Sequence, residues 1–383
     1  MTNAVVVAYG RSAIGKAGKG SLARTHPVDF GAEVLNGVLA RVPQLDPVEI
    51  DDLVLGCAMP ESTMGMNPAR NIVLRAGLPD VVSGQTVNRF CSSGLQAIAT
   101  ATALIDAGMA DVIVAGGVEH MSSPVLSAAP EYQDPWLREH TDAYISMGLT
   151  AERVARKWGV TRDEMDQMAV DSHARAAAAR DRGAFTAQIV PVAAVGEDGA
   201  TTTFAVDEGV RPSTTKAALA GLVPVFAEDG LVTAGTSSQR SDGAGFAVLT
   251  SSRRAQELGA TPVARLLGFA VAGVEAQYMG IGPVAAVPKV LARTGLTLAD
   301  IDVIELNEAF AAQAIAVMRE LGMDWGSVNV NGGALAMGHP LGATGAILVA
   351  KALAELEVTG GRLALVTMCI GGGMGAAGVI ERL

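Results

Sequence analysis

Residues 88–95 read Asn-Arg-Phe-Cys-Ser-Ser-Gly-Leu, and they place Cys91 at the junction between an expected strand and an expected helix. Residues 85–87 form the end of that strand, and apolar residues recur at helical spacing from Leu95 to Ile105. Unpaired backbone N–H groups and the positive end of the helix dipole favour a thiolate at a helix N-terminus, against a free pKa of about 8.5. We therefore interpret Cys91 as a nucleophile, whereas most intracellular cysteines are buried and structural.

Three polar clusters lie far downstream, and each follows a short apolar run that predicts a strand. The clusters are Asn-Glu-Ala-Phe at 307–310, Gly-His-Pro-Leu-Gly-Ala-Thr-Gly at 338–345 and Cys-Ile-Gly-Gly-Gly-Met-Gly at 369–375, and the predicted strands are 303–306, 328–330 and 363–368. Ligands bind at the carboxyl ends of the strands in parallel sheets. An asparagine, a histidine and a second cysteine can therefore converge on Cys91 although they are remote in sequence.

Taken together, these segments resemble the thiolase family, and the resemblance covers essentially the whole chain. It also includes residues 10–16, 116–121, 147–152 and 233–235. Any single motif is weakly specific, whereas four active-site motifs in the family's order and approximate spacing are highly specific. The resemblance implies an α/β fold with a duplicated five-layered α-β-α-β-α architecture, in which two similar halves flank an inserted loop domain.

An internal repeat supports the duplication. A helix-to-strand unit at residues 38–41 and 50–55 returns at residues 290–293 and 301–306, about 250 residues later. We expect three domains: an N-terminal half at 1–120 plus about 241–262, a loop domain at 121–240, and a C-terminal half at 263–383. The first half would supply the nucleophile, and the second half the remaining reactive groups.

Composition excludes several other classes of protein. With 383 residues and a mean hydropathy of +0.34, the chain can bury a large core. It lacks both a transmembrane stretch and a signal peptide pattern, so we expect a cytoplasmic protein. The net charge of −11 argues against a nucleic-acid-binding surface. Three widely spaced cysteines indicate thiol chemistry in a reducing compartment, and neither disulfides nor a metal site is expected.

The resemblance implies a role for each reactive group. Cys91 would attack the 3-keto carbon of a 3-ketoacyl-CoA and carry the acyl group, and His339 would help to deprotonate Cys91. Cys369 would protonate the departing carbanion and then deprotonate the incoming coenzyme A. The enolate oxygen would be held by His339 and by a water that Asn307 positions. The oxygen of the tetrahedral intermediate would be held by the backbone N–H groups of Cys91 and Gly371, which form the oxyanion hole.

In the family, the region that corresponds to the loop domain covers the pantetheine and nucleotide parts of coenzyme A. Substrate or coenzyme A contacts are expected at Ser238, Met147, Met279 and Phe310, although core packing explains Met147 equally well. Thr236 departs from the asparagine that is common at its position. Coenzyme A is expected as a co-substrate, without a permanently bound cofactor. The sequence does not identify the Lys or Arg side chains that would bind its phosphates.

Residues 88–96 look more like the degradative 3-ketoacyl-CoA thiolases than the biosynthetic acetoacetyl-CoA enzymes, and Ser146 stands where many biosynthetic members have histidine. We therefore predict an acyltransferase of fatty acid β-oxidation. It would cleave 3-ketoacyl-CoA with coenzyme A to acetyl-CoA and a shortened acyl-CoA, and the reaction is reversible as a Claisen condensation.

Three alternatives stay open. A biosynthetic acetoacetyl-CoA thiolase (acetyl-CoA C-acetyltransferase) would use the same groups. A decarboxylating ketoacyl synthase shares the fold but generally uses a Cys-His-His or Cys-His-Asn set, so Cys369 argues against it. A non-catalytic thiolase-like lipid-binding protein need not retain all four groups. The resemblance also implies a homodimer or homotetramer, and it leaves a multifunctional β-oxidation subunit open as a partner.

Overall fold

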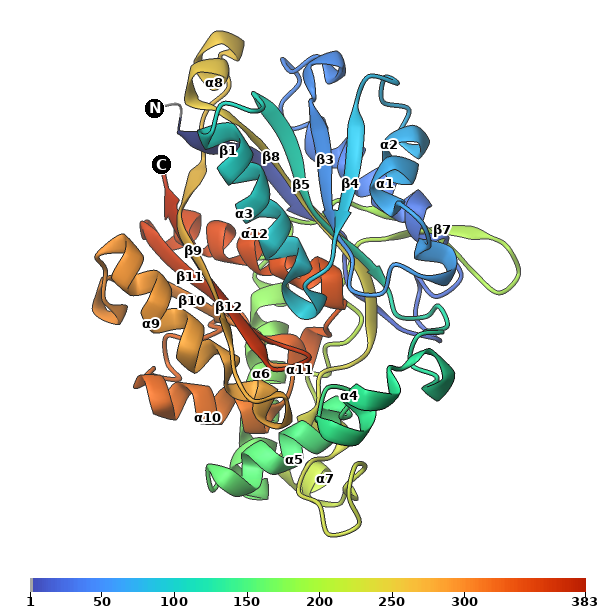
Figure 1. Cartoon of the computed structure of the whole chain (residues 1–383), viewed down its shortest axis with the longest axis vertical. Coiled ribbons are helices and arrows are strands. Elements are labelled where there is room, and N and C mark those ends of the chain that lie inside the picture. The colour runs from blue at the N-terminus through green and yellow to red at the C-terminus, as the bar shows by residue number, and fades with distance from the viewer. Residues whose placement is uncertain (1–2) are drawn as a thin grey trace.

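The computed structural model describes residues 3–383, and its centre is one long mixed sheet (Figure 1). The strands of this sheet are β1 (Ala4–Arg11), β2 (Gly15–Lys16), β3 (Asp52–Gly56), β4 (Ser83–Val87), β5 (Val112–His120), β8 (Ser241–Ser251), β9 (Ala264–Gly273), β10 (Val303–Leu306), β11 (Leu363–Ile370) and β12 (Met374–Arg382). A separate hairpin contains β6 (Val192–Val195) and β7 (Thr201–Phe204).

Helices cover both faces of the sheet and fill the insertion. They are α1 (Pro27–Leu39), α2 (Pro68–Arg75), α3 (Ser93–Asp106), α4 (Pro135–His140), α5 (Met147–Lys157), α6 (Arg162–Asp181), α7 (Lys216–Ala220), α8 (Ser252–Leu258), α9 (Gly282–Thr294), α10 (Ala311–Leu321), α11 (Ala334–Met337) and α12 (Leu341–Thr359). The longest helix in the insertion is α6, which begins at a reciprocal capping box between Thr161 and Glu164. Within residues 3–383, none of the helices is long and apolar enough to cross a membrane.

The strand order shows the duplication directly. The sheet runs β10-β11-β12-β9-β1-β8-β5-β3-β4. The first half has the order β1-β8-β5-β3-β4, and the second half has the equivalent order β9-β12-β11-β10. Equivalent neighbours are parallel or antiparallel in both halves alike. The halves join where Val6 of β1 pairs with Ala264 of β9. The repeated helix-to-strand unit is therefore confirmed as α1 with β3 and α9 with β10.

The strand predicted at residues 328–330 is wrong. This segment makes a single parallel bridge, between Val328 and Ile304, at the place that β4 occupies in the first half. Asn329 has a φ of +49°, which ends any extended run. Its side-chain amide instead binds the backbone N–H and carbonyl of Leu306, at 2.9 and 2.7 Å. A side chain thus replaces part of the missing ladder.

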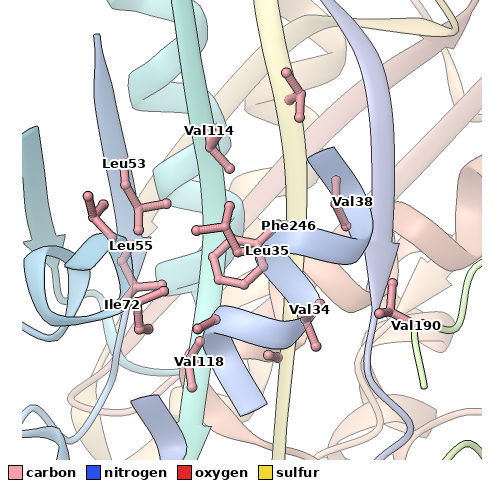
Figure 2. Close-up of a cluster of buried hydrophobic side chains, with 14 of the residues drawn as sticks. Val34, Leu35, Val38, Leu53, Leu55, Ile72, Val114, Val118, Val190 and Phe246 are labelled. Carbon is pink, nitrogen blue, oxygen red and sulfur yellow. The ribbon is translucent and has the colours of Figure 1, made fainter. Parts of the chain in front are cut away.

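Alternating side chains divide the core into layers. Val112 and Val114 of β5 pack outward with α1, whereas Ile113 and Ala115 pack inward with α3 and α12. Figure 2 shows the outer cluster, with side chains of α1 packed against the strands. A third cluster packs α9 and α10 on β10, β11 and β12. The two halves of the sheet form two separate layers, with α3 and α12 between them and the outer helices on either side. This order confirms the five-layered α-β-α-β-α architecture.

Each half has an equivalent polar contact at the start of its parallel strands. Asp51 accepts hydrogen bonds from the backbone N–H groups of Asp111 and Val112, which lead into β5, at 2.8 and 3.0 Å. Asp302 accepts the equivalent bonds from Arg362 and Leu363, which lead into β11, at 2.7 and 2.8 Å. Each carboxylate ties two neighbouring parallel strands together at the edge of the sheet opposite to their carboxyl ends.

Candidate active site

Cys91 lies in a tight turn between β4 and α3, as the sequence predicts. A short 3-10 turn (Phe90–Ser92) leads directly into α3 at Ser93. Phe90 has a φ of +43°, and the Asn88 side chain accepts a hydrogen bond from its backbone N–H at 2.8 Å. The Ser93 hydroxyl accepts from the Arg89 N–H and donates to the Phe90 carbonyl. The position at a helix N-terminus is therefore confirmed, and the turn around it is firmly hydrogen-bonded.

The helix that follows His339 begins beside the helix that follows Cys91. A Cβ atom on Gly94 of α3 would lie 2.8 Å from the carbonyl oxygen of Gly342 in α12. A Cβ atom on Gly345 would lie 2.2 Å from the backbone nitrogen of Leu95. Because these glycines lack a Cβ, the two helices meet backbone to backbone. Close packing of the two N-termini thus brings a residue of the first half next to one of the second.

One cavity of about 350 Å³ collects most of the predicted site residues. Cys91 and His339 line it, and so do the four predicted substrate contacts, Ser238, Met147, Met279 and Phe310. The wall is largely apolar, because methionine, phenylalanine and leucine side chains supply much of it. Such a cavity suits an acyl or pantetheine chain that must reach a thiol.

Phe226 is a wall residue that the sequence analysis missed. Its ring packs edge-to-face with Phe310, with 6.0 Å between the ring centroids, and lies over Gly148 at the start of α5. A Cβ atom on Gly148 would lie 2.0 Å from this ring. Phe226 comes from the irregular segment before β8, where no periodic pattern marks it. Only the neighbouring glycine, in the Met-Gly-Leu-Thr sequence, hints at a close contact.

Hydrogen bonds define the protonation pattern of His339, which is buried. The Thr344 hydroxyl donates to the carbonyl of Pro340 at 2.9 Å, so it accepts from Nδ1 of His339 at 2.6 Å. The proton therefore sits on Nδ1, and Nε2 carries the lone pair. The amide Nδ2 of Asn307 contacts that lone pair at 3.3 Å. His339 thus presents a basic nitrogen that only a long hydrogen bond occupies.

Burial controls the charge of both groups in the cavity. It raises the pKa of Cys91 to about 11, although hydrogen bonds from the N–H groups of Gly371 and of Cys91 itself act in the opposite direction. Burial lowers the pKa of His339 to about 4. Desolvation thus outweighs the helix N-terminus and favours the thiol over the thiolate that the sequence predicts. At neutral pH the pair is a thiol and a neutral imidazole.

Asn307 and Cys369 are fully buried at the ends of their strands. Neither residue lines the cavity, but Asn307 contacts His339, which does. Burial, followed by the proximity of Cys91, raises the pKa of Cys369 well above its ordinary value. Cys57 is also buried, and burial together with Glu119 raises the pKa of its thiol. Its predicted position in the core is confirmed.

A cysteine and a histidine at adjoining helix N-termini, contributed by two equivalent α/β halves, are features of an acyl-transferring thiolase. Residues 4–253 match the family described as thiolase, N-terminal domain, and residues 260–382 match thiolase, C-terminal domain. The chain belongs to the thiolase family. The predicted family, its fold and the general activity of an acyltransferase are therefore confirmed.

Individual relatives are similar over their whole length. A 3-ketoacyl-CoA thiolase of Bacillus subtilis is 49% identical, with 100% of both chains covered. The crystal structure of the Bacillus anthracis acetyl-CoA acetyltransferase matches with a TM-score of 0.92 and 40% identity, covering 100% of this chain and 99% of that one. Human mitochondrial 3-ketoacyl-CoA thiolase matches with a TM-score of 0.91 and 36% identity, at the same coverage.

Proposed function

We propose that the protein is a 3-ketoacyl-CoA thiolase, which cleaves 3-ketoacyl-CoA with coenzyme A into acetyl-CoA and a shortened acyl-CoA. The observation that carries this proposal is the shared cavity, because Cys91 and His339 both line the same largely apolar space. The 49% identity to a 3-ketoacyl-CoA thiolase over the full chain supports the choice of substrate class. Fatty acid β-oxidation is the process in which this reaction would serve.

The first half-reaction would start from a neutral pair. His339 takes the proton of Cys91 as the sulfur adds to the 3-keto carbon, so two buried charges form only as the bond forms. Collapse of the tetrahedral intermediate breaks the carbon–carbon bond and expels the enolate of acetyl-CoA. Cys369 donates a proton to the enolate carbon. The acyl group stays on Cys91 as a thioester.

The second half-reaction would return the acyl group to coenzyme A. Cys369, now a thiolate, removes the proton from the thiol of the incoming coenzyme A. The new thiolate adds to the thioester carbon, and the sulfur of Cys91 leaves and recovers its proton from His339. Atoms and charges then balance, and both cysteines return to the thiol form. A thiol that accepts and donates in turn fits the position of Cys369 beside Cys91.

Two sets of donors would stabilise the oxyanions. The backbone N–H groups of Cys91 and Gly371 act to lower the pKa of the Cys91 thiol, and we propose that the same two groups bind the oxygen of the tetrahedral intermediate. Gly372 and Gly373 follow with φ values of +78° and +85°, a backbone path that glycine adopts without strain. For the enolate oxygen, we propose His339 with a water held by Asn307.

The insertion at residues 121–240 would cover the bound coenzyme A, which acts as a co-substrate and not as a resident cofactor. Ser238, Met147, Met279 and Phe310 are the proposed contacts for the pantetheine and acyl chain, since they line the cavity with Cys91. The family resemblance supports a homodimer or homotetramer, and we propose a cytoplasmic location from the sequence pattern. A multifunctional β-oxidation subunit stays open as a partner.

An acetyl-CoA acetyltransferase is the second candidate, because the Bacillus anthracis enzyme of that name has nearly the same fold. The reacting groups would be identical, so the substrate range separates the two. The test is coenzyme A-dependent cleavage of a 3-ketoacyl-CoA series from four to sixteen carbons, with acetyl-CoA quantified. Faster cleavage at six carbons and above supports the proposal. Activity confined to acetoacetyl-CoA supports the second candidate, and absence of activity at every length contradicts both.

A further inference from the structure

Glu119 is a buried carboxylate that the proposed chemistry does not use. It lies near the carboxyl end of β5 and is 1% exposed. One oxygen, Oε2, accepts hydrogen bonds from the backbone N–H groups of Ala58 at 2.8 Å and Gly342 at 2.7 Å. The other, Oε1, accepts from the N–H of Met59 at 3.2 Å. A single side chain therefore holds two segments that are about 280 residues apart in sequence, at Ala58 and at Gly342.

Each of these segments leads to a reacting group. Gly342 is in the first turn of α12, three positions after His339. On the other side, the carbonyl of Ala58 accepts a hydrogen bond from the Asn88 side chain at 3.0 Å. That same side chain accepts from the N–H of Phe90, the neighbour of Cys91. A continuous path of hydrogen bonds thus runs from the Cys91 turn, through Glu119, to the helix that carries His339.

Burying this carboxylate opposes its ionisation. Desolvation raises the pKa of Glu119 to about 7, while its three backbone N–H partners lower it. The negative charge also raises the pKa of the Cys91 thiol, so it does not assist formation of the nucleophile. An electrostatic role in activating Cys91 would need the opposite sign. What the carboxylate supplies is a fixed geometry between two backbone segments.

We propose that Glu119 is a positioning residue, which fixes Cys91 relative to His339 by holding the loop after β3 and the first turn of α12 on one carboxylate. This inference rests on the proposed function, because it concerns proton transfer between the same two groups. Proton transfer is sensitive to small displacements, so loosening this contact slows acylation without changing the cavity wall. Glu119 is not among the residues that line the cavity.

The test compares Glu119→Gln and Glu119→Leu with Asp302→Asn. Asp302 is the matched control, since one of its oxygens also accepts two backbone N–H groups, but at the opposite edge of the sheet. We expect kcat for thiolysis to fall by about fivefold or more in Glu119→Gln and further in Glu119→Leu, while KM changes by less than about threefold. Asp302→Asn should keep kcat within about twofold of wild type, because distant sites act independently.

Alkylation of Cys91 by iodoacetamide separates positioning from a general loss of structure. Removing the charge of Glu119 makes the thiol easier to ionise, so alkylation at pH 8.5 should be as fast as in wild type or faster, while acylation is slower. Unchanged kcat in Glu119→Gln would overturn the inference, and so would an equal loss in Asp302→Asn or a parallel loss of alkylation. Glu119→Gln decides the matter if Glu119→Leu does not fold. Thiolysis by the wild type tests the proposed function separately, since the inference concerns only the ratio of variant to wild type.

Discussion

The hydroxyl of Thr344 lies 2.6 Å from Nδ1 of His339 and gives its own proton to the carbonyl of Pro340. From this arrangement we assign the proton of the neutral imidazole to Nδ1 and the lone pair to Nε2, the atom that Asn307 contacts. The tautomer is what allows His339 to act as a base, so a side chain that touches no substrate determines whether the base is available.

Replacing Thr344 with valine removes the acceptor for Nδ1 at nearly constant volume. We expect kcat for thiolysis to fall by about tenfold or more, since part of the His339 population then carries its proton on the wrong nitrogen. Thr344→Ser keeps the hydroxyl and should retain most of the activity. Steady-state kinetics of both variants checks this, and equal losses in the two would show that the hydroxyl is not what keeps His339 active.

Replacing Cys91 and replacing Cys369 should block different steps of the reaction. Cys91→Ala removes the proposed nucleophile, so no acyl-enzyme should form. Cys369→Ala should still acylate in the condensation direction but turn over slowly, because the second proton transfer has lost its group. Intact-protein mass spectrometry after mixing with acetyl-CoA measures acylation, and steady-state thiolysis measures turnover. Wild-type turnover in either variant would contradict the mechanism.

Alkylation of Cys91 should titrate at high pH in the ligand-free protein. Because burial raises its pKa to about 11, the rate with iodoacetamide should still be increasing at pH 9, above the ordinary midpoint of about 8.5. Cys91→Ala provides the background from the two other buried thiols. A rate that levels off below pH 8 would show that the thiolate is favoured after all.

Acid should destabilise the protein in part through His339. Its folded pKa of about 4 is below the value of about 6.5 in the unfolded chain. Between these values only the unfolded state takes up the proton, so this contribution to stability is full above pH 6.5 and is lost as pH falls toward 4. The loss amounts to about 2 to 3 kcal/mol between pH 7.5 and 4.5.

Urea unfolding at those two pH values tests this expectation. His339→Asn should be less stable than wild type at pH 7.5, but its own loss on acidification should be smaller. If the difference between the two pH values is the same in both proteins, His339 is not a source of the acid sensitivity.

Gly148→Ala tests the wall of the cavity. The added Cβ would lie 2.0 Å from the ring of Phe226, so the ring must move away from Phe310. We expect KM for 3-ketoacyl-CoA to rise more than kcat falls, since the change affects the wall and not the reacting groups. Gly221→Ala is the control, because its Cβ would make only an ordinary contact at 3.6 Å. Equal kinetics in the two variants would exclude Phe226 from the substrate wall.

The sequence predicts the strands and helices near the site well where periodicity is strong. The junction at Cys91 and the strands before Asn307 and Cys369 are examples. It fails at residues 328–330, where an asparagine in the left-handed region binds the neighbouring strand through its side chain. Periodicity of apolar residues does not register such a contact.

The charge of Cys91 illustrates a second limit. Local sequence indicates the helix N-terminus, which favours the thiolate, but only the packed structure reveals how completely the thiol is removed from water. Glu119, Thr344 and Phe226 were missed for a related reason. Their roles depend on partners that are distant in sequence or irregular in backbone, and no spacing rule connects them.

The equivalent contacts of Asp51 and Asp302 show that the two halves remain alike at one edge of the sheet and differ at the other. At the edge where the strands begin, an aspartate in each half binds two backbone N–H groups of the neighbouring strand, and the two aspartates are about 250 positions apart. At the other edge, the copies have specialised, and Cys91 has no counterpart that repeats its role. Equivalent positions of the two halves should therefore tolerate the same substitutions at the first edge and different ones at the second. A scan of paired positions would map, from fitness alone, where the ancestral symmetry has been lost.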